Sequence, residues 1–369
     1  MKYFLIAGEA SGDQHAAVLI AQIKQRDPHA QFAALGGDRM AAAGCRLYRD
    51  YSHMAFMGIA AVIRHWRDVR DNFRIAREAL MNERPDVLIL IDYPSFNLRM
   101  AAFCRKHLSN TRIVYYIPPK VWAWKRRRIH QIARLCDEVL GIFPFEPAFY
   151  AQYGYHCTYV GNPTAEGIDR YVQSRKTANA QRQKTIAILP GSRPSEISNC
   201  LPRMLEAARR FPEYNLRVCA APGIADNFYT PYLRAGETLT RDTYATVQQA
   251  SAAIVNSGTA TLETALLGCP QVAVYHLALS WLIALIRWAQ PWVFSIKHFT
   301  PVNIISGKEV IKEYVANEFK TDLVAAELQH LLTDEAYQKE MLANYKHLYD
   351  LLGTLPASAT AADIITSKR

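Results

Sequence analysis

The sequence predicts an α/β protein built from two Rossmann-like, doubly wound domains that face each other across a cleft. Its 369 residues exceed what one hydrophobic core usually organises, which favours two domains. With 50% hydrophobic and 21% charged residues, the composition is that of a compact globular protein rather than a disordered one. Short apolar runs that end in Gly, Asp or Pro alternate with longer amphipathic segments, as in β-α-β units around a parallel sheet.

The first domain is expected to span residues 1–165. The chain turns at Gly161-Asn162-Pro163, and the polar segment 173–184 follows with four basic residues, so we place the boundary just after the turn. The expected strands of this domain are Tyr3–Ala7, Phe32–Leu35, Val87–Ile91, Ile113–Tyr116 and Val139–Ile142.

The second domain is expected to span residues 166–340 and to repeat the pattern. In open sheets of this type, ligands bind beyond the carboxyl ends of the strands, which is where every motif described below falls. Its expected strands are Thr185–Leu189, Leu216–Ala220, Ala253–Asn256 and Gln271–Tyr275.

The formal net charge of +10 suggests an anionic partner, which charge alone leaves open between phosphate, nucleic acid and acidic lipid. The most hydrophobic stretch, 277–296, is interrupted by Arg287 and Pro291, so no membrane-spanning helix is predicted. Seven cysteines without a C-x-x-C spacing are interpreted as reduced core thiols, and no metal site is expected.

The first βα turn reads Gly8-Glu9-Ala10-Ser11-Gly12-Asp13. Small residues here let a ligand approach backbone N–H groups at a helix N-terminus. The spacing differs from the dinucleotide-binding fingerprint G-x-G-x-x-G. A plain tight turn capped by Asp13 is the alternative.

Asp92 directly follows the apolar strand Val87–Ile91. A carboxylate at such a strand end can be partly desolvated, which raises its pKa and suits it to remove a proton from a substrate hydroxyl. Asp92 is therefore our candidate for the general base. The alternative is an aspartate that caps the next helix or accepts from loop amides.

Aromatic and basic residues stand together at 115–128, including Trp122, Lys125 and the three arginines that follow it. This combination suits an anionic, partly apolar ligand such as a phosphorylated glycolipid. The alternative is a solvated basic helix face with tryptophans in the core. Nucleic-acid binding is not expected, because no nucleic-acid-binding module surrounds the patch.

Two loops of the second domain suit a diphosphate. Gly191-Ser192-Arg193 follows its first strand, and Ser257-Gly258-Thr259-Ala260 follows a later one, with Glu263 one turn further along the helix. Hydroxyls and N–H groups at a helix start attract phosphate, Arg193 can neutralise a departing diphosphate, and Glu263 can accept from ribose hydroxyls. Simple helix capping is the alternative.

Two segments combine tryptophans with arginines and fit helices lying in a lipid headgroup region. One contains Val62, Ile63 and Trp66, and the other contains Trp281 and Trp288. Ordinary core packing of the apolar side chains is the alternative for each segment.

Taken together, the motifs resemble the lipid-A-disaccharide synthases over nearly the whole chain. The order and spacing of the matching segments carry this likeness. They are Gly8–Asp13, Gly36-Gly37 with Met40, Met57-Gly58, Asp92 with Pro94 and Phe96-Asn97, Val121-Trp122-Ala123-Trp124, Pro144-Phe145-Glu146, Leu189–Arg193 and Ser257–Ala260.

The resemblance implies a GT-B fold and an inverting, β-1,6-forming glycosyltransferase that needs no metal or organic cofactor. Its donor would be UDP-2,3-diacylglucosamine and its acceptor 2,3-diacylglucosamine 1-phosphate. Together with the two segments rich in tryptophan and arginine, which predict a peripheral protein on an anionic membrane surface, this places the expected reaction at the cytoplasmic face of the inner membrane. Asp92 would be the base that acts on the acceptor 6-hydroxyl, and Arg193 would be the second catalytic residue, in contact with the donor phosphates. The final helix, which we assign to 341–365, would cross back onto the first domain. The remaining donor-site residues would be Gly191, Ser192, Ser257, Gly258, Thr259, Ala260, Glu263 and Asn303, and the acceptor-side residues Glu9, Ser11, Gly12, Asp13, Trp122, Lys125 and Asn162.

The sequence departs from the family pattern in three places: at Pro118-Pro119-Lys120, at Pro301-Val302-Asn303, where only the asparagine carries over, and at Lys312-Glu313. Two other functional hypotheses remain open. One is another UDP-sugar enzyme of the same fold, either a peptidoglycan-type N-acetylglucosaminyltransferase or an epimerase, and the other is a non-catalytic lipid- or nucleotide-binding protein. The oligomeric state, monomer or homodimer, also stays open.

Overall fold

The computed structural model describes residues 1–54, 66–123, 126–175, 182–276 and 298–367. The chain divides into two compact units. Unit 1 comprises Met1–Pro163 together with Thr354–Arg369, and unit 2 comprises Thr164–Gly353.

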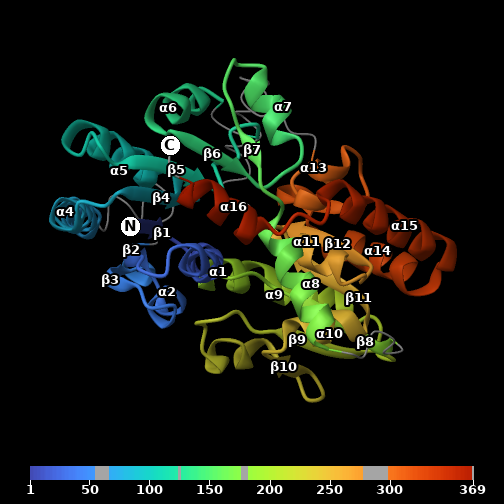
Figure 1. Cartoon of the computed structure of the whole chain (residues 1–369). Helices are drawn as coiled ribbons and strands as arrows, with labels where there is room; N and C mark the ends of the chain where they lie inside the picture. The colour runs from blue at the N-terminus through green and yellow to red at the C-terminus, as the bar shows by residue number, and fades with distance from the viewer. Residues whose placement is uncertain (55–65, 124–125, 176–181, 277–297, 368–369) are drawn as a thin grey trace. The chain divides into compact units, whose positions relative to one another are not determined.

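Unit 1 is built on a seven-stranded sheet in the order β3-β2-β1-β4-β5-β6-β7, with every pair parallel (Figure 1). This is the strand order of a doubly wound Rossmann-like sheet, extended by one strand. The strands are β1 (Lys2–Ala7), β2 (Gln31–Gly36), β3 (Arg46–Asp50), β4 (Val87–Ile91), β5 (Arg112–Tyr116), β6 (Glu138–Gly141) and β7 (Thr158–Tyr159).

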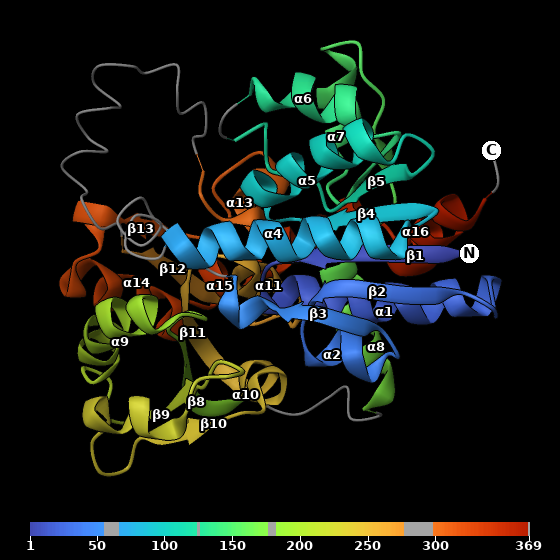
Figure 2. The same cartoon turned by 90° about the vertical axis from the view of Figure 1, so that its left-hand side faces the viewer.

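Helices cover both faces of this sheet. Successive side chains of a strand point to opposite faces, so Tyr3 and Leu5 pack with α1 and α16, whereas Phe4 and Ile6 pack in the core that α4, α5 and α6 cover. Figure 2 shows α4 running alongside the strands. The helices are α1 (Ala10–Arg26), α2 (Asp38–Ala42), α4 (Trp66–Glu83), α5 (Pro94–His107), α6 (Arg128–Leu135), α7 (Glu146–Ala151) and α16 (Ala357–Thr366).

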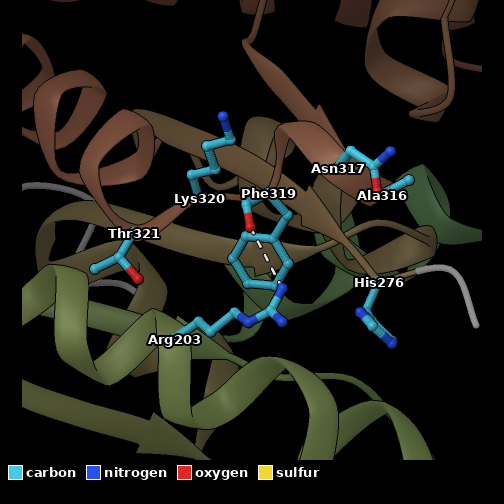
Figure 3. Close-up of a pocket in the computed structure, with 7 residues that line it drawn as sticks. All are labelled: Arg203, His276, Ala316, Asn317, Phe319, Lys320 and Thr321. Atoms are coloured by element: carbon cyan, nitrogen blue, oxygen red, sulfur yellow. Dashed lines mark hydrogen bonds between the residues drawn. The ribbon is translucent and has the colours of Figure 1, made fainter. Parts of the chain in front are cut away.

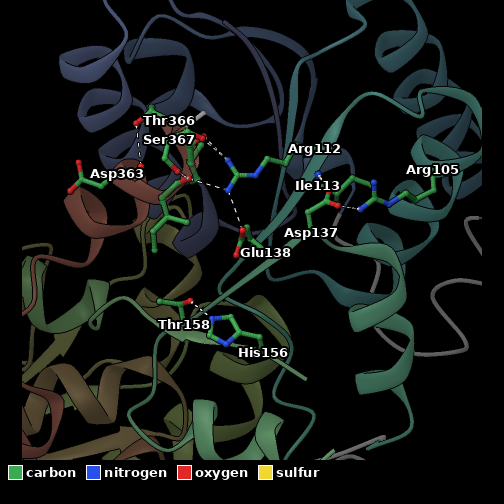
Figure 4. Close-up of polar contacts among 12 residues, drawn as sticks. Arg105, Arg112, Ile113, Asp137, Glu138, His156, Thr158, Asp363, Thr366 and Ser367 are labelled. Carbon is green, nitrogen blue, oxygen red and sulfur yellow. Dashed lines mark hydrogen bonds and ion pairs between the residues drawn. The ribbon is translucent and has the colours of Figure 1, made fainter. Parts of the chain in front are cut away.

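The helix α16 belongs to unit 1 although it lies at the far end of the chain. Buried Ala361, Ala362 and Ile365 join the core beneath α1. Arg112 of β5 fixes the end of the helix, because its guanidinium donates to the carbonyls of Ile364, Ile365 and Ser367 at 3.1 to 3.3 Å (Figure 4). The segment that returns to unit 1 thus begins after Gly353, whereas residues 341–352 of the range we assigned to it lie in α15 of unit 2.

Unit 2 repeats the design with a six-stranded parallel sheet in the order β10-β9-β8-β11-β12-β13. Its strands are β8 (Gln183–Leu189), β9 (Asn215–Cys219), β10 (Thr238–Thr240), β11 (Ala250–Asn256), β12 (Gln271–Tyr275) and β13 (Glu313–Val315). Its helices are α8 (Pro163–Ser174), α9 (Pro194–Ala208), α10 (Thr243–Gln249), α11 (Thr259–Leu266), α13 (Pro301–Ser306), α14 (Thr321–Thr333) and α15 (Glu335–Leu352). Short 3₁₀ helices lie at Asp226–Phe228, Thr230–Tyr232 and Ala316–Glu318 in unit 2, and at Tyr51–His53 in unit 1.

Two further findings concern the described part of the chain. All seven cysteines are buried and none is paired in a disulfide, as expected for core thiols. Within the ranges given above, none of the helices is both long enough and apolar enough to span a bilayer.

Candidate active site

The candidate residues of unit 1 gather at one edge of its sheet. Because all seven strands are parallel, the segments that follow them emerge at the same edge. Glu9 follows β1, Asp92 follows β4, Trp122 lies in the segment after β5, and Asn162 follows β7. Unit 1 therefore brings these four predicted residues to one edge.

Asp92 stands at this edge in an unusual backbone conformation. Its φ is 45°, that of Tyr93 is 47°, and that of Ile117 at the end of neighbouring β5 is 62°. The left-handed region is costly for residues with a Cβ, and such residues concentrate at functional sites. The N–H of Asp92 donates to the carbonyl of Ile117 at 3.1 Å, which links the two strand ends. The Asp92 side chain is exposed to solvent, so the partial desolvation we expected is not present in this structure.

Two buried side chains hold the main-chain carbonyl of Asp92. The Tyr115 hydroxyl donates to it at 2.8 Å, and Asn97 Nδ2 donates to it at 2.7 Å. Asn97 Nδ2 also lies 3.2 Å from the carbonyl of Ile91. Burial raises the pKa of Tyr115 well above its usual value of 10, so this hydroxyl keeps its proton and remains a donor.

The first βα turn packs closely against this segment. A Cβ added to Gly8 would lie 2.3 Å from Cγ of Tyr93, so only glycine leaves room for the tyrosine ring. Glu9 is half-buried, Ser11 is exposed, and Gly12 is buried in the first turn of α1. Glu9 and Ser11 are therefore the polar residues of this turn with accessible side chains, and Ala10 between them is exposed as well.

Asp13 has a different place from the one we predicted. It is buried, and its Oδ1 accepts the backbone N–H groups of Gly37 and Met40 at 2.9 and 3.1 Å. Its Oδ2 accepts the N–H of Arg39 at 3.1 Å. The carboxylate thus caps α2 from a distance, and these three bonds occupy it in place of a substrate.

Trp122 and Glu146 join two further loops of the same edge. The Trp122 indole N–H donates to Oε1 of Glu146 at 3.2 Å, and the indole lies edge-on against Phe143 and Phe145. Nearby, Asn162 Nδ2 donates to the carbonyl of Ile142 at 3.1 Å. Trp122 is half-buried and Asn162 is buried, so Trp122 is the more accessible of the two.

Several predicted residues lie outside the described residues. These are Lys125 of the basic patch and the membrane-contact candidates Val62, Ile63, Trp281 and Trp288. Trp66 is the first residue of α4, but its side chain is not among those that the structure describes.

In unit 2, the segments after β8 and β11 also meet at one edge, because these strands are parallel neighbours. Gly191 has a φ of 118°, and a Cβ there would lie 2.7 Å from Asn256 Nδ2, at the end of β11. Glu196 organises the first loop: its Oε2 accepts the N–H of Ser192 at 3.0 Å and its Oε1 accepts from Arg193 Nη1 at 3.1 Å. Arg193 is thereby held at the start of α9, with its side chain 37% exposed.

The second loop leads into α11. Ser257, Gly258 and Ala260 are partly accessible and Thr259 is exposed, at a helix start that no side chain caps. One turn later, Oε1 of Glu263 accepts the hydroxyl of Tyr244 at 2.9 Å. Burial raises the pKa of Glu263 above its usual value, and this hydrogen bond opposes the rise.

Asn303 lies away from any ligand-accessible surface. It is fully buried; its Oδ1 accepts the N–H groups of Val310 and Ile311 at 2.7 and 3.0 Å, and its Nδ2 donates to the carbonyl of Ile311 at 2.8 Å. These bonds fasten the loop after α13. Both polar atoms of the side chain are hydrogen-bonded to backbone groups, so the structure does not support the donor contact that we predicted from the resemblance.

A pocket of about 450 Å³ opens on unit 2 at the ends of β12 and β13 (Figure 3). The Arg203 guanidinium lies 5.4 Å from the ring of buried Phe319, and burial and the nearby Arg203 charge lower the pKa of His276. The pocket is lined by Arg203, His276, Ala316, Asn317, Phe319, Lys320 and Thr321, none of which is acidic. In the part of the chain that the structure describes, no three His, Cys, Asp or Glu side chains group to hold a metal ion.

The structure also reveals residues that sequence reasoning did not select. Glu196 carried a usable signal, because a glutamate three residues after a helix cap is a recognised capping pattern. Glu146 stood in a matching motif but had no assigned role. Asn97 likewise stood in a matching motif without an assigned role, and Tyr115 lay in the aromatic and basic segment without being selected. The importance of these two residues and of Tyr244 depends on partners distant in sequence or on a strand end that only the fold defines.

Comparison with known proteins agrees with this architecture. The family model described as lipid-A-disaccharide synthetase matches residues 3–363. The lipid-A-disaccharide synthase of Geobacter sulfurreducens is 35% identical, with 99% of this chain and 96% of that protein covered. The corresponding protein of Nitrosococcus oceani is 34% identical, over 98% of this chain and 94% of its own length.

Solved structures extend the likeness to the fold. The UDP-GlcNAc 2-epimerase of Methanocaldococcus jannaschii, solved with UDP-GlcNAc and UDP, has a TM-score of 0.65 at 9% identity and 99% coverage of both chains. The glycotransferase of kitacinnamycin has a TM-score of 0.64 at 13% identity, over 99% of this chain and 98% of its own. The predicted α/β fold of GT-B type is confirmed. A family model that spans nearly the whole chain, together with full-length relatives at about one-third identity, shows that the protein belongs to the lipid-A-disaccharide synthetase family.

Proposed function

We propose that the protein is an inverting glycosyltransferase that condenses UDP-2,3-diacylglucosamine with 2,3-diacylglucosamine 1-phosphate. The products are the β-1,6-linked lipid A disaccharide 1-phosphate and UDP. Membership of the lipid-A-disaccharide synthetase family is the observation that carries this function. The alternatives are a peptidoglycan-type N-acetylglucosaminyltransferase, an epimerase and a non-catalytic binding protein. They are not favoured, because the family model and the full-length relatives are lipid-A-disaccharide synthases, whereas the epimerase likeness is one of fold at 9% identity.

In the proposed reaction, Asp92 is the general base. It accepts the proton of the acceptor 6-hydroxyl as that oxygen forms a bond to the anomeric carbon of the donor. The bond from this carbon to the diphosphate breaks on the opposite side, and its electron pair leaves with UDP. The exposed position of Asp92 at the carboxyl edge of the sheet allows a substrate hydroxyl to reach it.

Glu9, Ser11 and Trp122 share the edge of Asp92 in unit 1 and are proposed to line the acceptor side. A half-buried tryptophan beside two phenylalanines offers an apolar surface of the kind that an acylated sugar requires. Gly12 contributes by its small size, since a Cβ there would lie 3.2 Å from the Cβ of Ala7.

The donor side is proposed to be the edge of unit 2. N–H groups and hydroxyls at Ser192, Ser257 and Thr259 suit the diphosphate, and Arg193 balances the charge that develops on the leaving UDP. Glu263, oriented by Tyr244, suits the ribose hydroxyls. The pocket in Figure 3 extends this edge, and its basic lining suits an anionic group of the donor.

We further propose that the protein acts as a peripheral protein on the cytoplasmic face of the inner membrane. Helices α4, α5 and α6 support this proposal, because they cover one face of the unit 1 sheet and carry many arginines. The helix α5 contains no Asp or Glu in Pro94–His107, and α6 contains none in Arg128–Leu135. Binding to vesicles with and without anionic lipid, at low and high salt, tests this; equal partitioning in all four conditions contradicts it.

The enzymatic proposal is tested with purified protein in mixed micelles that contain both substrates, following UDP and disaccharide with wild type and Asp92→Asn. We expect product from wild type and a loss of about two to four orders of magnitude in kcat for the variant, with UDP affinity retained. Equal turnover by both proteins would remove Asp92 from the mechanism and keep the reaction. No product from a folded wild type that binds UDP would refute the reaction itself.

A further inference from the structure

The geometry of Asp92 depends on two neighbours that lie beneath the surface. Asp92 and Tyr93 are consecutive residues with φ of 45° and 47°, in a region that residues with a Cβ rarely adopt. Aspartate tolerates this conformation better than most residues with a Cβ, but Tyr93 does not, and a residue that precedes a proline normally adopts an extended conformation. The left-handed conformation of Asp92 and Tyr93 persists only if surrounding contacts hold it.

Those contacts converge on one atom, the main-chain oxygen of Asp92. Tyr115 reaches it from β5 with its hydroxyl at 2.8 Å, and Asn97 reaches it from the first turn of α5 with Nδ2 at 2.7 Å. Both side chains are fully buried in the core of unit 1. Because burial raises the pKa of Tyr115 well above its usual value of 10, the hydroxyl is protonated and available as a donor at neutral pH.

We propose that Tyr115 and Asn97 are positioning residues that aim the Asp92 carboxylate at the acceptor hydroxyl. The two donors fix the peptide plane that follows Asp92, and that plane determines the direction in which its side chain leaves the strand end. Both residues are too deeply buried to touch substrate, so they act on the reaction only through Asp92. This inference rests on the proposed role of Asp92 as the base.

The chain offers a matched control for Tyr115. Tyr150 of α7 lies in the same core cluster and is equally buried, but its hydroxyl has no hydrogen-bond partner among the residues that the structure describes. Tyr115→Phe and Tyr150→Phe therefore remove the same atom from the same core. Only the first removes a contact to Asp92.

The test measures kcat, KM and unfolding for both variants, with activity scaled to folded protein. We expect Tyr115→Phe to lower kcat about tenfold or more with little change in KM, because small misplacements of a catalytic group are costly in rate. Tyr150→Phe is expected to leave kcat within about twofold of wild type. Asn97→Ser, which shortens the second donor, is expected to lower kcat in the same way as Tyr115→Phe.

A double variant separates positioning from a general structural role. If Tyr115 acts through Asp92, then Asp92→Asn combined with Tyr115→Phe is no slower than Asp92→Asn alone. Additive losses in the double variant, or equal kcat for Tyr115→Phe and Tyr150→Phe, overturn the inference while Asp92 remains the base. Full activity of Asp92→Asn overturns the proposed base instead, so the two failures are distinguishable.

Discussion

The indole N–H of Trp122 donates to Oε1 of Glu146 at 3.2 Å, while Oε2 of the same carboxylate accepts the N–H groups of Ile142 and Phe143 at 2.8 and 3.0 Å. One fully buried side chain thus ties the segment after β5 to the turn after β6. Burial raises the pKa of Glu146 to about 7, although the three donated hydrogen bonds oppose the rise.

This relationship predicts a pH dependence of stability. Because the folded-state pKa is raised from 4.5 to about 7, the folded protein keeps a proton that the unfolded chain releases within this window. The contribution to the unfolding free energy is fully present below pH 4.5 and is lost as the pH rises to about 7, by at most about 3 kcal/mol. Urea unfolding at a series of pH values measures this slope.

The substitution Glu146→Gln is expected to remove that component of the slope, because an amide does not titrate. Glu213→Gln, at an exposed position, is the matched control and is expected to keep the wild-type slope. If Glu146→Gln and wild type show the same pH dependence, the carboxyl of Glu146 does not control it.

Asp13→Ala is expected to destabilise unit 1 rather than to weaken substrate binding. It leaves the N–H groups of Gly37, Arg39 and Met40 without their acceptor, at a cost of about 3 kcal/mol in unfolding free energy. Asp38→Ala, exposed in the first turn of α2, is the control and is expected to cost less than about 1 kcal/mol. A variant with wild-type stability and a raised acceptor KM would instead make Asp13 a substrate contact.

Glu263→Gln is expected to weaken UDP binding about tenfold, because a charged acceptor for the ribose hydroxyls is replaced by a neutral amide. Tyr244→Phe is expected to have a smaller effect of about threefold, because it removes only the hydroxyl that orients Glu263. Titration calorimetry with UDP and with its 2′-deoxy form measures both. A ribose contact predicts that the loss nearly disappears with the deoxy nucleotide, and an equal loss with both ligands would argue for a merely structural role.

Asn303→Ala is expected to reduce stability by about 3 kcal/mol and to leave UDP affinity unchanged in the folded protein. Three backbone groups of Val310 and Ile311 lose their partner in this variant. Asn303→Asp keeps the acceptor for two of them and is expected to fall between wild type and Asn303→Ala. Unfolding curves combined with UDP titration check this, and a stable variant with weakened UDP binding would restore the donor contact.

The sequence predicted the interior strands of both sheets and missed the strands at their edges. Nine apolar runs were identified, and each corresponds to an interior strand, from β1 (Lys2–Ala7) to β12 (Gln271–Tyr275). The four missed strands, β3, β7, β10 and β13, are the edge strands, and their residues are half-buried or exposed. An edge strand has no need of a continuous apolar run, so hydrophobic periodicity does not reveal it.

For the candidate site, too, the sequence predicted the positions of some residues correctly and missed the contacts of others. The sequence placed Asp92 at a strand end, Arg193 at a helix start and Glu263 one turn into a helix, because the alternation of strand and helix determines where such residues emerge. It did not distinguish Asp13 and Asn303, whose side-chain oxygens accept hydrogen bonds from backbone N–H groups, from residues that face solvent. Nor did it show that Tyr115 and Asn97 hold the carbonyl of Asp92. The sequence alone determined the order of the elements and the sheet edges at which the candidate site residues emerge. Only the tertiary structure decided which polar groups remain available, because hydrogen-bond partners distant in sequence meet only when the sheet and helices have packed.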